Sequence, residues 1–228
     1  MRFHNFFKTH RYKILVGTPI VFLLIMNSAE VLESENRYTI VTDGSPFVLV
    51  DKTVHLTLIV NSNAPVNALG GTITFPKDVA VVEKVTREPS TISLWSEEPI
   101  FSNTDGELKF SGGIPNGREA LKNAPILTLD LRMLKPGKVV LRMKNGMLLA
   151  NNGKGTNIFS GQDQLITLWI REPDAPSPDI NNDGTLSIAD VNMLYLKTFR
   201  SNDPRYDLNR DGKVNWGDVK FLALMTSS

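Results

Sequence analysis

Asp179-Ile-Asn-Asn-Asp-Gly-Thr-Leu-Ser-Ile-Ala-Asp190 and Asp207-Leu-Asn-Arg-Asp-Gly-Lys-Val-Asn-Trp-Gly-Asp218 are two stretches of the same length that follow one pattern. Both place Asp, Asn and Asp at positions 1, 3 and 5, Gly at 6, Ser or Asn at 9, and Asp at 12. This is the spacing of a twelve-residue calcium-binding loop. The repeat therefore predicts a small C-terminal module, residues 179–228, that holds two structural Ca²⁺ ions.

Oxygen-bearing residues recur in each loop at the positions that calcium coordination requires. Calcium takes six to eight oxygens at about 2.3–2.6 Å, and short alternate side chains converge on one ion as the chain curls around it. Position 7 offers only its backbone carbonyl, so a lysine there is compatible with binding. The predicted ligands are Asp179, Asn181, Asp183, Thr185, Ser187 and Asp190 in the first loop, and Asp207, Asn209, Asp211, Lys213, Asn215 and Asp218 in the second.

The two loops differ in charge and share one departure from a standard EF-hand. Asp190 and Asp218 stand where an EF-hand has Glu, so the following helix must approach the ion more closely. Arg210 and Lys213 add positive charge to the second loop alone. We therefore predict that the first loop binds calcium more tightly than the second.

A helical pattern of apolar residues follows each loop. These residues are Val191, Leu194, Tyr195 and Phe199 after the first loop, and Val219, Leu222 and Leu224 after the second. A short amphipathic helix gains most of its stability from packing its apolar face, so the two repeats are expected to pack together. The alternative is a pair of Asx-rich surface turns that bind nothing. Two loops that match at six positions, each leading into a helix, argue against it.

The stretch from Tyr38 to residue 171 has the pattern of strands. Val54 to Val60 alternates apolar and polar residues, and turn signals such as Pro136-Gly137 separate the apolar runs. This alternation predicts a mainly β fold, an antiparallel jelly-roll sandwich of eight or nine strands. Residues 172–178 contain three prolines, which predicts a short, semi-stiff linker before the calcium module.

The N-terminus has an export pattern over residues 1–29. Basic residues precede an apolar run from Ile14 to Met26, and Ala29 offers a cleavage site. The run is too short to cross a bilayer comfortably and suits a signal peptide. The expectation is an exported protein, extracellular or at the cell surface, with residues 14–26 either removed or kept as a membrane anchor. The alternative, a buried core helix, does not account for the basic flank.

Composition excludes several kinds of chemistry. The chain has no cysteine, which removes disulfides, thiolate metal sites and cysteine nucleophiles. Its net charge of +1 gives no global field that would attract nucleic acid. Of the three histidines, His4 and His10 lie in the export segment, and His55 alternates outward on a strand. Glu97-Glu98 is an adjacent pair that points to opposite faces of a strand, unlike the paired carboxylates of a glycosidase. No catalytic residue is predicted.

The C-terminal repeat resembles a type I dockerin, on the motif Asp-x-Asn-x-Asp-Gly-x-x-(Ser/Asn)-x-x-Asp-Val with one helix after each loop. The resemblance implies calcium-dependent folding and docking into a cohesin domain, on another protein or on another copy of this chain. In that family, loop positions 10 and 11 help to select the cohesin. Here they are Ile188-Ala189 and Trp216-Gly217, instead of the familiar Ser-Thr pairs.

The sandwich region resembles a cohesin, without a sharp motif. The similarity lies in Val54–Val60, the strand that ends at Phe75, the segment that starts at Pro76, and the late strands around Ile126–Leu131 and Gly137–Leu141. This implies a dockerin as partner for the sandwich. The leading interpretation is thus a non-catalytic adaptor with two docking surfaces. The first alternative is a carbohydrate-binding protein with Trp95 in an aromatic platform, and the second is an accessory enzyme of polysaccharide degradation.

Overall fold

The computed structural model describes residues 36–226 except Arg118 and Gln162. The predicted export segment, residues 1–29, lies outside the described residues. Within the described part, no helix combines the length and apolar character needed to cross a membrane.

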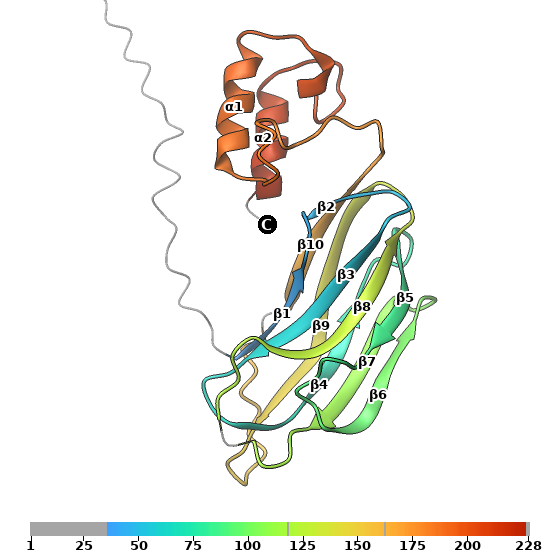
Figure 1. Ribbon diagram of the computed structural model, residues 1–228, viewed down its shortest axis with the longest axis vertical. Coiled ribbons are helices and arrows are strands. Elements are labelled where there is room, and N and C mark those ends of the chain that lie inside the picture. The colour runs from blue at the N-terminus through green and yellow to red at the C-terminus, as the bar shows by residue number, and fades with distance from the viewer. Residues whose placement is uncertain (1–35, 118, 162, 227–228) are drawn as a thin grey trace, which may run out of the picture. The chain divides into compact units, whose positions relative to one another are not determined.

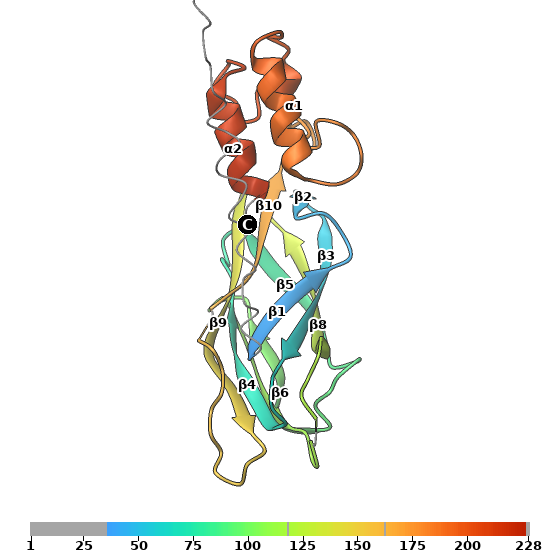
Figure 2. The ribbon, with the colours of Figure 1, turned by 90° about the vertical axis from the view of Figure 1, so that its left-hand side faces the viewer.

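Ten strands form two sheets that face each other (Figures 1 and 2). The four-stranded sheet has the order β1 (Arg37–Thr42), β3 (Thr53–Asn61), β8 (Ala124–Met133) and β5 (Ala80–Thr86). The six-stranded sheet has the order β2 (Phe47–Leu49), β10 (Gln164–Arg171), β9 (Gly137–Ala150), β4 (Val66–Thr74), β7 (Glu107–Gly113) and β6 (Leu94–Ser102). Because most connections cross from one sheet to the other, neighbours within a sheet are far apart in sequence.

The predicted sandwich is confirmed, with two corrections. The pairing is not antiparallel throughout, because β2 runs parallel to β10 with Phe47 opposite Trp169. The strand count exceeds the predicted eight or nine, since β2 and β6 had not been predicted. A three-residue strand such as β2 is too short to show alternation, and two register shifts interrupt the alternation of β6.

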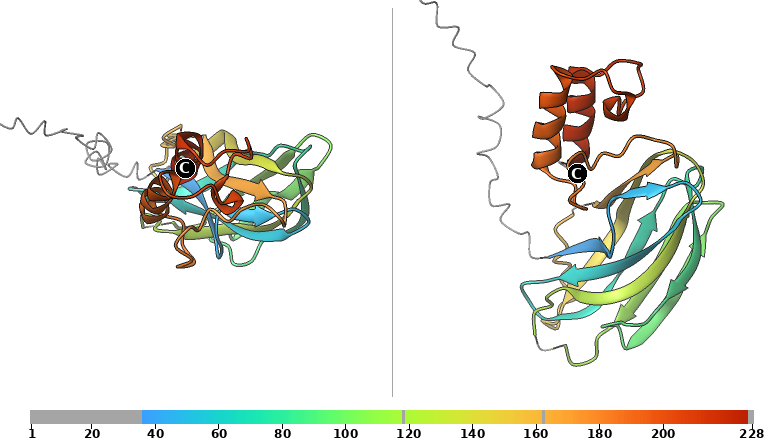
Figure 3. Two further views of the ribbon diagram at one scale, coloured as in Figure 1. Left: turned by 90° about the horizontal axis from the view of Figure 1, so that it is seen from above. Right: turned by 45° about the horizontal axis from the view of Figure 1, so that its top comes forward.

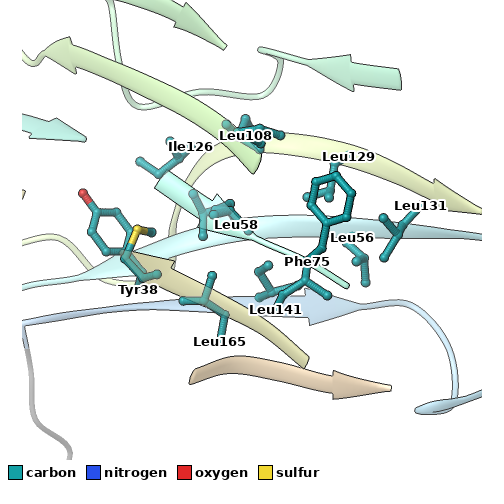
Figure 4. Close-up of a cluster of buried hydrophobic side chains, with 14 of the residues drawn as sticks. Tyr38, Leu56, Leu58, Phe75, Leu108, Ile126, Leu129, Leu131, Leu141 and Leu165 are labelled. Carbon is teal, nitrogen blue, oxygen red and sulfur yellow. The ribbon is translucent and has the colours of Figure 1, made fainter. Parts of the chain in front are cut away.

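The core lies between the two sheets (Figure 4). The alternation predicted for β3 is confirmed, because Leu56, Leu58 and Val60 are fully buried while His55 points to solvent. Leu129 and Leu131 on the neighbouring strand β8 enter the same core. Apolar side chains from both inner faces leave water together, which is the main favourable term for a sandwich of this kind.

Tyr38 joins the two sheets by a polar contact inside this core. Its hydroxyl donates to the carbonyl of Met147 (2.8 Å) and accepts from the amide of Gly70 (3.1 Å). Tyr38 lies on β1 of the four-stranded sheet, whereas Gly70 and Met147 lie on β4 and β9 of the other. Burial raises the pKa of the phenol above its ordinary value, so it remains a hydrogen-bond donor.

The C-terminal segment forms two helices, α1 (Ile188–Thr198) and α2 (Trp216–Thr226), with the 3₁₀ turn η2 (Pro204–Tyr206) between them. The helices lie side by side (Figure 3). As predicted, they pack through a shared apolar cluster, made by Val191, Leu194, Leu208, Val219, Leu222 and Met225.

Two residues predicted on the buried stripe of these helices are instead exposed. Phe199 and Leu224 are 69% and 66% exposed. Leu224 is two residues after Leu222, which places it about 200° around the helix, whereas Met225 at i+3 returns to the buried side. Phe199 is the C-cap of α1 and lies past its last helical residue.

Candidate calcium loops and helix face

The two loops curl in the same way. Asn182 and Gly184 have φ values of +57° and +81°, and Arg210 and Gly212, at the same loop positions, have +59° and +83°. These left-handed conformations bend the chain back on itself at positions 4 and 6. Glycine adopts them without steric cost and asparagine tolerates them, whereas Arg210 adopts a conformation that its side chain disfavours.

The first aspartate of each loop accepts hydrogen bonds from inside the curl. The Asp179 carboxylate accepts from the amides of Asp183 (3.1 Å) and Gly184 (2.9 Å). Asp207 accepts in the same way from Asp211 (3.1 Å) and Gly212 (2.9 Å). The sequence repeat is therefore a repeat of hydrogen bonds as well.

The last aspartate of each loop is fully buried, with 0% of its surface exposed. Asp190 accepts from the amides of Ile180 (2.8 Å) and Ser187 (2.8 Å), which lie at opposite ends of the loop. Asp218 accepts from the amides of Asn209 (3.1 Å) and Asn215 (2.8 Å). All these donors are neutral. A carboxylate withdrawn from water among neutral donors is strongly stabilised by a cation beside it.

Position 9 has a role that the sequence reasoning missed. Ser187 is the N-cap of α1: its hydroxyl accepts from the amide of Ala189 (3.1 Å), while Asp190 returns a bond to the Ser187 amide. Asn215 does the same for α2 and accepts from the amide of Gly217 (2.6 Å). The Ser-x-x-Asp and Asn-x-x-Asp spacings resemble the capping box and signalled this role.

Positions 3 and 5 lie on the outer side of the curl. Asn181 accepts from the amide of Asp183 (2.9 Å), and Asp183 accepts from the hydroxyl (2.7 Å) and amide (2.8 Å) of Thr185. The Thr185 hydroxyl, then the Thr185 amide and the Asn181 side chain, lower the pKa of Asp183 below its usual value. Asp183 therefore stays ionised.

The loops fit calcium in donor type and in chain path, but their carboxylates are not gathered around one point. Within the described residues, no three His, Cys, Asp or Glu side chains lie close enough together to hold a metal ion. Like-charged carboxylates repel, and here each takes amide donors instead. The buried Asp190 and Asp218 and the repeated left-handed turns are the parts of the site that the fold has already formed.

The second loop should be the weaker calcium site. Lys213, at position 7, is exposed, whereas Arg210 forms an ion pair with Asp174 (3.3 Å) that offsets part of its charge. Lys213→Thr, which copies the first loop, is expected to raise the affinity of the second loop about two- to fivefold. Calorimetric titration with calcium tests this, with Thr185→Lys as the reciprocal variant. A tighter second site in the unmodified chain would contradict the predicted order.

The predicted partner-binding residues begin the two helices. Ile188 and Trp216 are the first residues of α1 and α2, and both are exposed, as is Ala189. Gly217 has a local role instead, because a Cβ there would lie 2.9 Å from Asn209 and 3.0 Å from Asn215. Its small size keeps α2 close to its own loop.

An aromatic cluster stands at the junction of the helices. The Tyr195 ring packs edge-on against Phe199, with 5.0 Å between ring centroids, and against Trp216, with 5.8 Å. We call the exposed apolar surface of the two helices the helix face. Its members are Ile188, Met193, Leu196, Phe199, Trp216 and Leu224.

The other sequence candidates lie on the sandwich and do not form a shared site. Trp95 packs against the sandwich core, whereas Trp169 contacts Phe221 of the helix cluster, with 6.3 Å between ring centroids. His55 is exposed and bonds to Asp130 (2.7 Å). Glu98 forms an ion pair with Arg87 (2.7 Å).

The fold and the loops define a two-part chain, a β-sandwich followed by a double loop-helix repeat. No protein-family profile matches the chain, and no curated protein matches it. Similar solved structures include the cohesin module of a family 33 glycoside hydrolase from Clostridium perfringens, with 11% identity, 60% of this chain and 98% of that one covered, and a TM-score of 0.42.

Two further similar chains come from cohesin–dockerin complexes. One is a type I complex of Clostridium thermocellum, with 12% identity, coverage of 60% of this chain and 100% of that one, and a TM-score of 0.42. The other is a type II cohesin–X–dockerin complex of Acetivibrio cellulolyticus, with 12% identity, coverage of 60% and 100%, and a TM-score of 0.43. These values describe a distant likeness, and the functional argument rests on the chain's own residues.

Proposed function

We propose that this protein is a non-catalytic docking adaptor whose C-terminal helix pair is ordered by two calcium ions. The observation that carries the proposal is the pair of fully buried aspartates, Asp190 and Asp218, each bonded to amides from both ends of its own loop. A bound cation offsets the cost of burying these charges. It also fixes the first turn of each helix to the loop before it.

The calcium ligands would come from the chain alone. Carboxylates at positions 1, 5 and 12, the amide oxygen at position 3 and the carbonyl at position 7 supply the hard oxygen donors that calcium prefers. Position 9 adds either a direct ligand or a water-mediated one while it caps the helix. Calcium supplies cross-linking charge here, and the residues that it orders carry the docking.

The helix face supports a protein partner. It places exposed Trp216, Phe199 and Leu224 on one small module. Exposed apolar patches of this kind mark interaction sites, and tryptophan is enriched among the residues that dominate binding energy. The partner we propose for this face is a cohesin domain, and the sandwich in turn offers a surface for a dockerin.

The position of Trp95 favours docking over sugar binding. A sugar platform needs aromatic rings whose faces are free, whereas Trp95 packs against the sandwich core. The basic and apolar N-terminal stretch supports export, and an extracellular protein meets the calcium concentration that such loops require.

Capture of cohesin domains tests the proposal. The immobilised full chain is expected to retain at least one member of a panel of purified cohesins in calcium and to release it in EDTA. Trp216→Asp is expected to weaken capture at least tenfold, because it removes the largest apolar side chain of the helix face. Val41→Asp, an exposed apolar position on the sandwich, is the matched control and should leave capture unchanged. Capture that persists in EDTA would contradict the proposal.

A further inference from the structure

Strand β6 displays an unusual row of side chains on the outer face of the six-stranded sheet. Leu94, Glu97 and Ile100 lie opposite Gly113, Ser111 and Lys109 of β7. These β7 residues alternate with the buried Leu108, Phe110 and Gly112, so they face outward. The three β6 residues therefore share the outer face.

Two β-bulges create this row. The register shifts between Trp95 and Glu97 and again between Glu97 and Ile100. In a regular strand, residues three apart would point to opposite faces. Each bulge adds one residue and returns the next side chain to the same face, an arrangement typical of strands that aim side chains at a partner.

The row is apolar at its ends and acidic in its middle. Leu94 and Ile100 are each 63% exposed, and Val41 is the one other large hydrophobic residue exposed on the described part of the sandwich. Glu97 is exposed, and no cation among the described residues pairs with it, whereas Glu98 is bound to Arg87 and Lys109 to Glu107. β6 is also the terminal strand of its sheet (Figure 1), so the row is accessible from the edge.

The helix face contains a complementary row on α2. Trp216, Lys220 and Leu224 follow one another at intervals of four residues, and all three are exposed. This stripe is apolar at its ends and cationic in its middle. The equivalent stripe on α1 has Ile188, the uncharged Asn192 and Leu196, so the cation belongs to α2 alone.

The two rows have similar lengths. Eight residues of helix from Trp216 to Leu224 rise about 12 Å. The β6 row spans the four β7 residues from Lys109 to Gly113, which is about 14 Å in an antiparallel sheet. The rows match in length, in their apolar ends and in their central charges, which are of opposite sign.

We propose that the helix face of one copy docks on the β6 row of a second copy, with Lys220 opposite Glu97 and with Trp216 and Leu224 against Leu94 and Ile100. The inference rests on the proposed function and names the partner as the chain itself. The two surfaces differ, so the contact is heterologous. Repeated contacts of this type build open chains of copies unless the rotation between neighbours closes a ring.

A charge-exchange experiment on the full chain tests the contact. Sedimentation velocity in calcium is expected to show mass that grows with concentration and falls in EDTA. Lys220→Glu and Glu97→Lys should each weaken association at least tenfold, because each sets like charges opposite one another. An equimolar mixture of the two variants should regain association, since every contact in alternating copies again joins opposite charges.

A neighbouring charge provides the control. Glu98→Lys should not restore association when it is mixed with Lys220→Glu, because Glu98 lies outside the row. Failure of the Glu97→Lys mixture to recover would overturn the proposed pairing. A wild-type chain that stays monomeric, while its helical signal still depends on calcium, would overturn self-docking and leave the adaptor function standing. A helical signal that does not respond to calcium would count against the adaptor function itself.

Discussion

Removal of calcium from this protein is expected to unfold the C-terminal helices and leave the sandwich folded. A ligand that binds only the folded state stabilises it by about 2.7 kcal/mol at a hundredfold excess over its Kd. The helix pair rests on a cluster of six buried apolar residues, a small core for two helices of eleven residues each. Without the ions, Asp190 and Asp218 remain buried and uncompensated, which adds a cost that this core has to offset.

Circular dichroism with hydrogen exchange measures this outcome. After addition of chelator, the helical signal should be lost and amides from Asp179 onward should exchange rapidly, while amides of β3 and β8 stay protected. Asp190→Asn and Asp218→Asn keep the shape of the side chain and remove its charge, so each should lower calcium affinity at one loop alone. Protection of the helices that is unchanged by chelator would refute a structural role for calcium.

Leu131→Ala is expected to destabilise the sandwich by about 2–5 kcal/mol, the usual cost of an unfilled cavity in a packed core. Leu131 is fully buried on β8, where it lies opposite Val54 of β3 and Val82 of β5. The inner face cannot collapse around the missing atoms, because both neighbouring strands hold β8 in place. Such a change is a large fraction of the stability of a typical domain.

Urea unfolding followed by tryptophan fluorescence and circular dichroism separates the two parts of the chain. The sandwich transition should move to lower urea, while the calcium-dependent helical signal stays where it is, because Leu131 belongs to the sandwich cluster and not to the helix cluster. Thr128→Ala on the same strand is the matched control and should change stability by less than about 0.5 kcal/mol. Equal shifts of both signals would mean that the two parts unfold as one unit.

The calcium loops were the most predictable part of this protein. Their chemistry is local: twelve residues contain the ligand types, and the glycine at position 6 permits the left-handed turn that the structure contains at Gly184 and Gly212. The strand pattern of β3 was equally readable, because period-two alternation indicates one buried face. Calcium binding itself, the export segment and the partners remain predictions.

Other features depended on the tertiary structure. Whether an apolar helical residue is buried depends on where the second helix packs, and this is why Phe199 and Leu224 stay exposed while Met225 is buried. The role of Tyr38 depends on strands far away in sequence, since its partner Met147 is 109 residues distant.

By itself, the sequence determined the local chemistry of the twin loops, the capping of the two helices and the alternation that makes a sandwich. These properties arise within a dozen residues, where spacing alone sets which groups meet. Tertiary structure alone decided that Leu94, Glu97 and Ile100 share a face. Their spacing along the chain places them on alternate sides, and only pairing with β7, with two residues bulged out of register, brings them together.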